Sequence, residues 1–264
     1  MAWDIFKTAF AEVFNRFGLA VKITLVPFFI LMAMSAILIG VGWSNFSFSN
    51  NAGPQFSLLV FFIGLLIVVA TIILFAWAAI SWHRATLLNE TVGFIPSLSG
   101  LPVGRYIGYS ILIGLILVVA AFVVVMLIGL VSAPFLPGLS GSNFMFISVV
   151  TLLIGSIAGI VLQYFWLRLA VILPGIAVDR PLGIGDGWHE TRDYAGPIFW
   201  LAAIITAITT GFSLLLLPIQ MASPTFSFIL QIPFNFIFFI FGISVMTEVY
   251  KRTSHVETVG DVFD

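Results

Sequence analysis

The sequence predicts an all-α membrane protein whose six transmembrane helices carry their charges on one side of the bilayer. Hydrophobic residues make up 61% of the 264 positions, charged residues make up 8%, and the mean hydropathy is +1.20. Soluble domains contain about 25% charged residues and less than half apolar residues, so a water-soluble fold is excluded. Six apolar runs are each long enough to cross a hydrocarbon core of roughly 30 Å as a helix.

The chain opens with a predicted amphipathic helix at residues 1–17. One side of this helix would be apolar and aromatic, and it contains Trp3, Phe6, Phe10, Val13, Phe14 and Phe17. The opposite side would carry mostly Asp4, Lys7, Glu12, Asn15 and Arg16. A helix of this kind lies in the membrane interface or docks on the surface of its own protein, and the sequence leaves both arrangements open.

The six predicted spans follow one another through turn-forming Gly, Pro, Ser and Asn residues. They cover residues 23–43, 56–82, 106–131, 144–171, 198–217 and 226–247. In the fourth span, Thr151, Gly155, Gly159 and Gln163 recur at i+4 steps, and small residues in that register let a neighbouring helix approach closely. Residues 248–264 are predicted to form a polar tail, and the whole chain, 1–264, is treated as a single integral membrane domain.

The positions of the ten Lys and Arg residues predict the orientation of the chain. With six crossings, nine of them lie before the first span, between the second and third, between the fourth and fifth or after the sixth, and Arg168 lies in the last turn of the fourth, at the same side. These regions share one side of the membrane, and the acidic residues lie there as well. Because cytoplasmic segments carry an excess of Lys and Arg, this side and both termini are predicted to be cytoplasmic.

The polar segment 166–197 contains the candidate interaction surface. A predicted interfacial helix at about 185–196 turns one apolar face inward, with Ile184, Trp188, Thr191, Ala195 and Ile198, and Asp186 is expected to cap its start. Its polar side faces solvent. The residues expected to meet lipid or a partner protein are Trp188, His189, Glu190, Arg192 and Asp193.

Two motifs resemble protease signatures. The stretch His189-Glu190-Thr191-Arg192-Asp193 differs from the H-E-x-x-H motif of zinc proteases at its last position, where Asp193 replaces a ligating His. His83 or His255 would have to complete such a site, and nothing in the sequence places them together. Gly138-Leu139-Ser140-Gly141 matches the G-x-S-G pattern of rhomboid proteases, but Ser140 is expected on the side opposite every His.

These considerations lead to a prediction of no enzymatic activity, no catalytic or metal-binding residues and no cofactor. His83, at the end of the second span, is expected to be a polar anchor rather than a haem or pigment ligand. The chain contains no Cys, and its basic residues are scattered singly, which argues against nucleic acid as a partner.

Three amide side chains, Gln163, Gln231 and Asn235, form the candidate intramembrane polar site. Pro233 lies between the last two, and a proline there would open the helix and free carbonyl groups for a small ligand. Hydrogen bonds between helices are the simpler interpretation of such residues. The three amides would serve a facilitator of a small uncharged or lipid-like substrate, which is the alternative to a non-enzymatic scaffold or accessory subunit.

One stretch resembles a group of known proteins. It consists of Trp166-x-Arg168, Ala177-Val178-Asp179-Arg180-Pro181-Leu182 and Gly185-Asp186-Gly187-Trp188 through Thr191-Arg192. It resembles the uncharacterised bacterial multi-pass YciC-like proteins and the membrane domain that accompanies some glycerophosphoryl diester phosphodiesterases. This resemblance implies a protein of the bacterial cytoplasmic (inner) membrane with no assigned activity, because the sequence holds no soluble phosphodiesterase domain. The expected partners are membrane lipids and either a partner membrane protein or a second copy of the chain.

Overall fold

The computed structural model describes residues 1–45, 58–94, 98–132, 144–180 and 182–254. The described residues form helices and no strand, which confirms the all-α fold class. In chain order the helices are α1 (Ala2–Asn15), α2 (Phe17–Asn45), α3 (Leu58–Leu87), α4 (Val103–Ser132), α6 (Phe144–Ala170), α7 (Ile172–Ala177), α8 (Ile184–Glu190), α9 (Ala195–Ala222) and α10 (Pro224–Thr253).

Six of these helices are long and apolar enough to cross a membrane, namely α2, α3, α4, α6, α9 and α10. They fall on the six predicted spans, and the protein is therefore a multi-pass integral membrane protein. The last helix continues beyond the predicted end of its span at residue 247 and includes Lys251 and Arg252 in its last turn. Basic side chains at that position stabilise a helix C-terminus because they face the negative end of the helix dipole.

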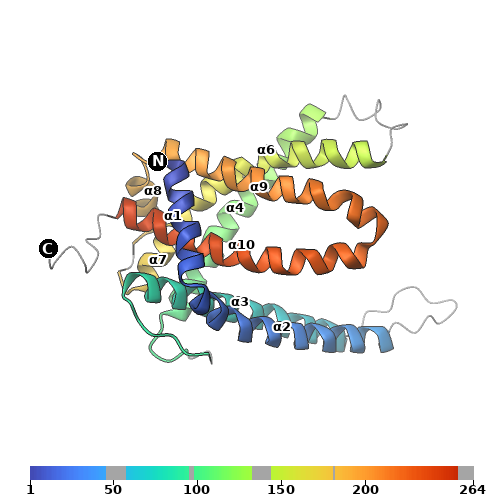
Figure 1. Ribbon diagram of the computed structural model, residues 1–264, viewed down its shortest axis with the longest axis horizontal. Helices are drawn as coiled ribbons and strands as arrows, with labels where there is room; N and C mark the ends of the chain where they lie inside the picture. Colours follow the sequence, from blue (N-terminus) through green and yellow to red (C-terminus); the bar gives the residue numbers. More distant parts are fainter. Residues whose placement is uncertain (46–57, 95–97, 133–143, 181, 255–264) are drawn as a thin grey trace.

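The long helices pack as three antiparallel pairs that meet at one end of the molecule (Figure 1). The pairs are α2 with α3, α4 with α6, and α9 with α10, and α6 also packs along α9. Helices α1, α7 and α8 lie at the end where α10 finishes, on the left of Figure 1. We call this the charged end, and we call the opposite halves of the long helices, where α2 and α3 diverge from α9 and α10, the far end.

The hydrophobic core is concentrated at the charged end. In α3, for example, every residue from Ala76 to His83 is buried, whereas Leu58, Leu59, Phe61 and Phe62 at the other end of the same helix are exposed. Continuous buried stretches of other helices are 167–170 of α6, 172–177 of α7 and 243–250 of α10. The hydrocarbon of lipid is as apolar as the exposed side chains of the far halves, so these halves do not need to be covered by protein.

The short helix α7 is a buried part of the polar segment 166–197. All residues of α7 are buried, and the helix packs against α3, α4 and α10. The stretch between Arg168 and Asp179 carries no charge, and apolar runs of roughly 10–14 residues are more often buried or re-entrant helices than spans. Gly175 lets α7 pack closely, because a Cβ atom there would lie 2.7 Å from the carbonyl oxygen of Arg180.

Helix α1 docks on the protein itself, which decides between the two arrangements left open by the sequence. It packs against α9 and α10 with Ile5, Ala9 and Val13 buried. The Ser244 hydroxyl of α10 donates a hydrogen bond to the carbonyl oxygen of Ala9 at 2.9 Å, and the ring of Phe6 meets Phe241 edge-on with centroids 5.1 Å apart.

Candidate functional site

His83 joins three helices at the charged end and is completely buried. Its Nδ1 lies 2.8 Å from the Thr247 hydroxyl, which itself donates to the carbonyl oxygen of Ile243 at 2.9 Å. The hydroxyl has a single proton, so it accepts from Nδ1–H, and Nε2 is left to accept from the Tyr106 hydroxyl at 3.4 Å. Both ring nitrogens of a neutral His83 therefore have partners within the protein.

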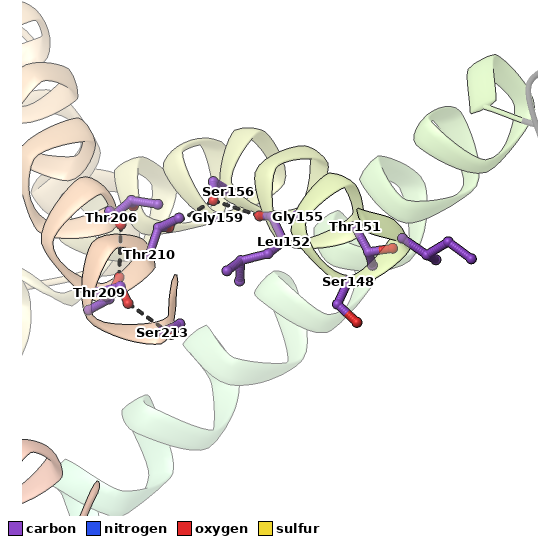
Figure 2. Close-up of a pocket in the computed structure, with 11 residues that line it drawn as sticks. Ser148, Thr151, Leu152, Gly155, Ser156, Gly159, Thr206, Thr209, Thr210 and Ser213 are labelled. Atoms are coloured by element: carbon purple, nitrogen blue, oxygen red, sulfur yellow. Dashed lines mark hydrogen bonds between the residues drawn. The ribbon is translucent and has the colours of Figure 1, made fainter. Parts of the chain in front are cut away.

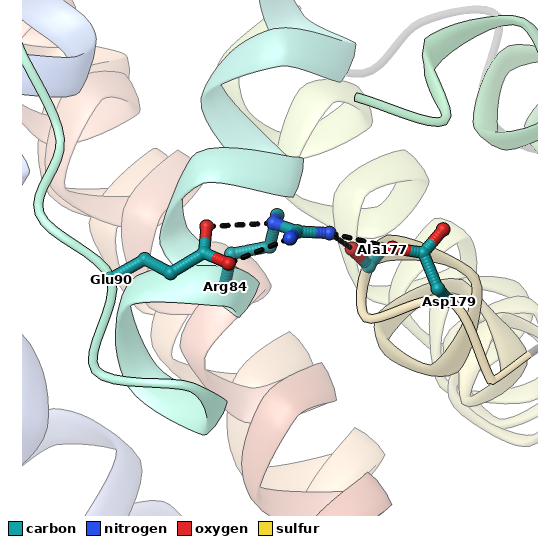
Figure 3. Close-up of polar contacts among 4 residues, drawn as sticks. All are labelled: Arg84, Glu90, Ala177 and Asp179. Carbon is teal, nitrogen blue, oxygen red and sulfur yellow. Dashed lines mark hydrogen bonds and ion pairs between the residues drawn. The ribbon is translucent and has the colours of Figure 1, made fainter. Parts of the chain in front are cut away.

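Arg84 connects three segments at the same end (Figure 3). Its guanidinium binds both carboxylate oxygens of Glu90 at 2.6 and 2.8 Å. It also donates to the carbonyl oxygen of Ala177, at the end of α7, and to the Asp179 carboxylate, both at 2.9 Å. The forked guanidinium suits such multiple contacts, and it holds α7 against the end of α3.

Arg168 fixes α8 onto the end of α6. It is only 5% exposed, and it donates to the Thr191 hydroxyl at 3.0 Å, the Tyr164 hydroxyl at 3.0 Å and the Trp188 carbonyl oxygen at 2.7 Å. The centre of the guanidinium lies 3.5 Å from the centroid of the Trp188 ring, a cation–π contact. Arg168 is therefore an internal clamp and not a solvent-exposed charge.

The predicted helix at 185–196 is shorter than expected, and a different side of it is buried. α8 ends at Glu190, residues 191–194 form turns, and α9 starts at Ala195. Gly187 and Thr191 are the buried positions of this segment, whereas Trp188 is 38% exposed. Gly187 faces inward because it packs closely on Ile172, and a Cβ atom at position 187 would collide with the Ile172 side chain. Asp186 is not the cap residue: its carboxylate accepts the N–H of Gly183, the residue at the cap position, at 2.9 Å.

The candidate interaction surface lies at the outside of this segment. His189, Arg192 and Asp193 are exposed, and Glu190 is partly buried. Because α8 ends at Glu190, His189 and Asp193 do not share one continuous helix, as a zinc-protease motif requires. Among the described residues, no group of three His, Asp or Glu side chains is placed to hold a metal ion. Ser140 and His255 lie outside the described residues.

A row of aromatic rings runs along the outer side of α1. Consecutive ring centroids are 5.1 Å apart for Trp3 and Phe6, 6.0 Å for Phe6 and Phe10, and 4.6 Å for Phe10 and Phe14. Trp3 and Phe14 are more than half exposed. We call these four residues the aromatic ridge. Sequence periodicity found the aromatic side of α1, but not its division into a docked face and an exposed one.

The three amides of the candidate intramembrane site do not meet. Gln163 lines a hollow of about 450 Å³ between α6, α9 and α10, which we call the Gln163 hollow. Asn235 lines a different hollow of about 300 Å³ between α2, α3 and α10. The Gln231 amide donates to the Ser227 hydroxyl of its own helix at 3.2 Å, and α10 runs through Pro233 without a break.

A second hollow of about 710 Å³ opens between α6 and α9 (Figure 2), and we call it the hydroxyl hollow. Gly159, Thr206 and Thr209 line both this hollow and the Gln163 hollow, so the two adjoin. Its polar lining residues are Ser148, Thr151, Ser156, Thr206, Thr209, Thr210 and Ser213. The sequence shows the small and hydroxyl-bearing residues of each span, but it does not show that those of α6 face those of α9.

Comparison of this chain with protein-family models, curated proteins and solved structures gives no match. The resemblance at residues 166–192 therefore stays a prediction, and the function has to be argued from the geometry.

Proposed function

We propose that this multi-pass membrane protein is a non-enzymatic scaffold or accessory subunit that meets lipid and a partner membrane protein at its charged end. One observation carries this proposal: the groups at that end that resemble reactive residues are used inside the fold. His83, Arg84 and Arg168 all direct their polar atoms at neighbouring helices. The residues left exposed, such as Trp3 and Arg192, are suited to contact rather than to chemistry.

The proposed orientation places the charged end in the cytoplasm of a bacterial cell, at the inner membrane. The Lys and Arg residues at the ends of the long helices, including Arg84, Arg105 and Lys251, support this orientation, because the side of a membrane protein richer in these residues is usually cytoplasmic.

The two exposed parts of this end have different proposed contacts. The aromatic ridge lies in the lipid headgroup region, where Trp rings and amphipathic helices are favoured. The exposed side chains of His189, Arg192 and Asp193 carry both signs of charge and meet a partner protein. A polar, mixed-charge patch of this kind is typical of the rim of a protein interface.

The alternative function, a facilitator that uses Gln163, Gln231 and Asn235, has less geometric support. Two of these amides line separate hollows, and the third is bonded within its own helix. A substrate pathway would need them on a shared surface.

Purification in mild detergent followed by mass spectrometry tests the proposal. We expect a stoichiometric partner with the wild-type chain and its loss with His189→Ala, Arg192→Ala and Asp193→Ala combined, while the exposed Arg105→Ala serves as the control and retains the partner. A chain that purifies without any partner would contradict the scaffold function.

Reporter fusions test the proposed orientation. Alkaline phosphatase fused after Asn50 should be active and fused after His255 inactive, and the reverse pattern would overturn the proposed orientation.

A further inference from the structure

The hydroxyl hollow lies well inside the part of the chain that crosses the membrane. Its lining residues occupy 147–159 of α6 and 206–213 of α9, in the central and far-end parts of both helices. Hydrocarbon offers no hydrogen bonds, so a hydroxyl at this depth needs a partner from the protein or from a ligand.

Several hydroxyls around the hollow are bonded within the helix pair. Ser156 donates to the carbonyl oxygen of Leu152 at 2.7 Å, and Ser213 donates to that of Thr209 at 2.9 Å. Thr210 then donates to the Ser156 oxygen across the helix pair at 2.7 Å, because the Ser156 proton is already engaged. Such bonds are ordinary in membrane helices and indicate packing rather than binding.

Thr206 differs from these residues. It is only 8% exposed, and among the described residues its hydroxyl has no hydrogen-bond partner. It lines the hydroxyl hollow and the Gln163 hollow, so the unused hydroxyl lies where the two adjoin. A ligand with a polar atom at this place would supply the hydrogen-bond partner that the Thr206 hydroxyl lacks within the protein.

The lining of the two hollows limits the chemistry of such a ligand. None of their described lining residues is charged, so a phosphate or a carboxylate would find no counter-ion. The Gln163 hollow is walled on α10 by Phe238, Phe239 and Phe241, which suit hydrocarbon. Each hollow lies within the roughly 300–1,000 Å³ that bound small molecules occupy.

We propose that the hydroxyl hollow and the Gln163 hollow form one binding site for an uncharged lipid that carries a hydroxyl group or an ester carbonyl. Its polar group bonds to the Thr206 hydroxyl, and its chains lie against the phenylalanines of α10 and the aliphatic side chains of α6. Lipid enters sideways between α6 and α9 from the bilayer. The site goes beyond the proposed scaffold function and does not depend on a partner protein.

Photolabelling of the full chain in phosphatidylcholine vesicles tests this site. The probe is diacylglycerol with a diazirine in one acyl chain, and mass spectrometry locates the labelled peptides. We expect the label on α6, α9 and α10 around Thr206, displaced by unlabelled diacylglycerol but not by phosphatidate with the same chains. Thr206→Val keeps the shape of the side chain and removes its hydroxyl, so labelling should fall about three- to tenfold.

Two further variants separate loss of the site from loss of the fold. Thr71→Val is the matched control, because the Thr71 hydroxyl donates to Ile67 of its own helix and lines neither hollow, so labelling should not change. Gly155→Leu places a large side chain in the hydroxyl hollow. A Cβ atom at residue 155 meets no atom within 4 Å, so the protein should fold and labelling should be blocked.

Equal labelling of Thr206→Val and the wild type, a label spread over all six spans, or equal competition by phosphatidate would overturn the lipid site. Labelling does not require the partner of the charged end. A chain that labels as expected but purifies without a partner would therefore contradict the scaffold alone.

Discussion

The charged end and the far end are built from the same six long helices, yet different interactions hold them together. At the charged end, buried side chains, α7 and the hydrogen bonds of His83, Arg84 and Arg168 join distant segments. At the far end the outer faces of α2, α3 and α4 are exposed apolar surface, and α9 touches α6 through small residues and hydroxyls. Contacts between distant segments therefore concentrate at the charged end, whereas the far end presents apolar side chains that suit hydrocarbon.

The largest effect is expected from Arg168→Ala. The substitution leaves the Thr191 hydroxyl and the Trp188 carbonyl oxygen without their buried donor and removes the cation–π contact. We expect a loss of roughly 3 kcal/mol in the free energy of unfolding, measured by thermal denaturation in detergent. Arg168→Lys should lose nearly as much, since an ammonium cannot reach three acceptors in a fork. The control is the exposed Arg105→Ala, and equal stability of both alanine variants would refute the clamp.

A smaller loss in the free energy of unfolding is expected from Gly175→Ala at the charged end. The same substitution at Gly64, at the far end, provides the comparison. The added methyl would lie 2.7 Å from the Arg180 carbonyl oxygen and 3.1 Å from the Tyr250 ring, so we expect a loss of about 1–3 kcal/mol. Gly64→Ala on α3 adds the same methyl where no atom lies within 4 Å and should be neutral or slightly stabilising. A melting temperature lowered equally by both variants would show that the two ends are packed alike.

The smallest effect is expected from Phe122→Ala on α4, at the far end. This side chain is 70% exposed, so its removal should change the free energy of unfolding by less than about 0.5 kcal/mol. Ile113→Ala, on the same helix but completely buried, should cost roughly 2 kcal/mol or more and shows that the denaturation assay is sensitive enough. A large loss from Phe122→Ala would mean that α4 is covered by another protein surface, which would favour a homo-oligomer.

The six spans followed from the sequence because hydrocarbon forces a crossing segment to be helical and apolar. For α1 the 3.6-residue period indicated a helix with an apolar side, but of the three buried residues Ile5, Ala9 and Val13 only Val13 was placed on that side. The sequence did not mark α7 as a separate helix, because its ten-residue apolar stretch directly continues the fourth apolar run and is too short to cross a membrane by itself.

The candidate sites were harder to predict, because they depend on which helix faces meet. The contacts of Arg168 could not be predicted, since nothing in the sequence shows that Thr191 folds back onto it. Gln163 and Asn235 line different hollows, and the hydropathy of a span does not show which way a side chain on it points. Nothing in the sequence distinguishes Thr206 from the other threonines of its helix. Its hydroxyl is recognised as lacking a partner only once the hydrogen bonds of the neighbouring hydroxyls are known.

The docking of α1 has a consequence for the order of events during synthesis. The hydrogen bond from Ser244 to Ala9 joins residues 235 positions apart, so α1 cannot occupy its final place until the last helix has been made. At roughly 5–20 residues per second, the ribosome takes on the order of tens of seconds to cover that distance. During this interval Ile5, Ala9 and Val13 lack the helix against which α1 packs most extensively, so the buried side of α1 is completed last.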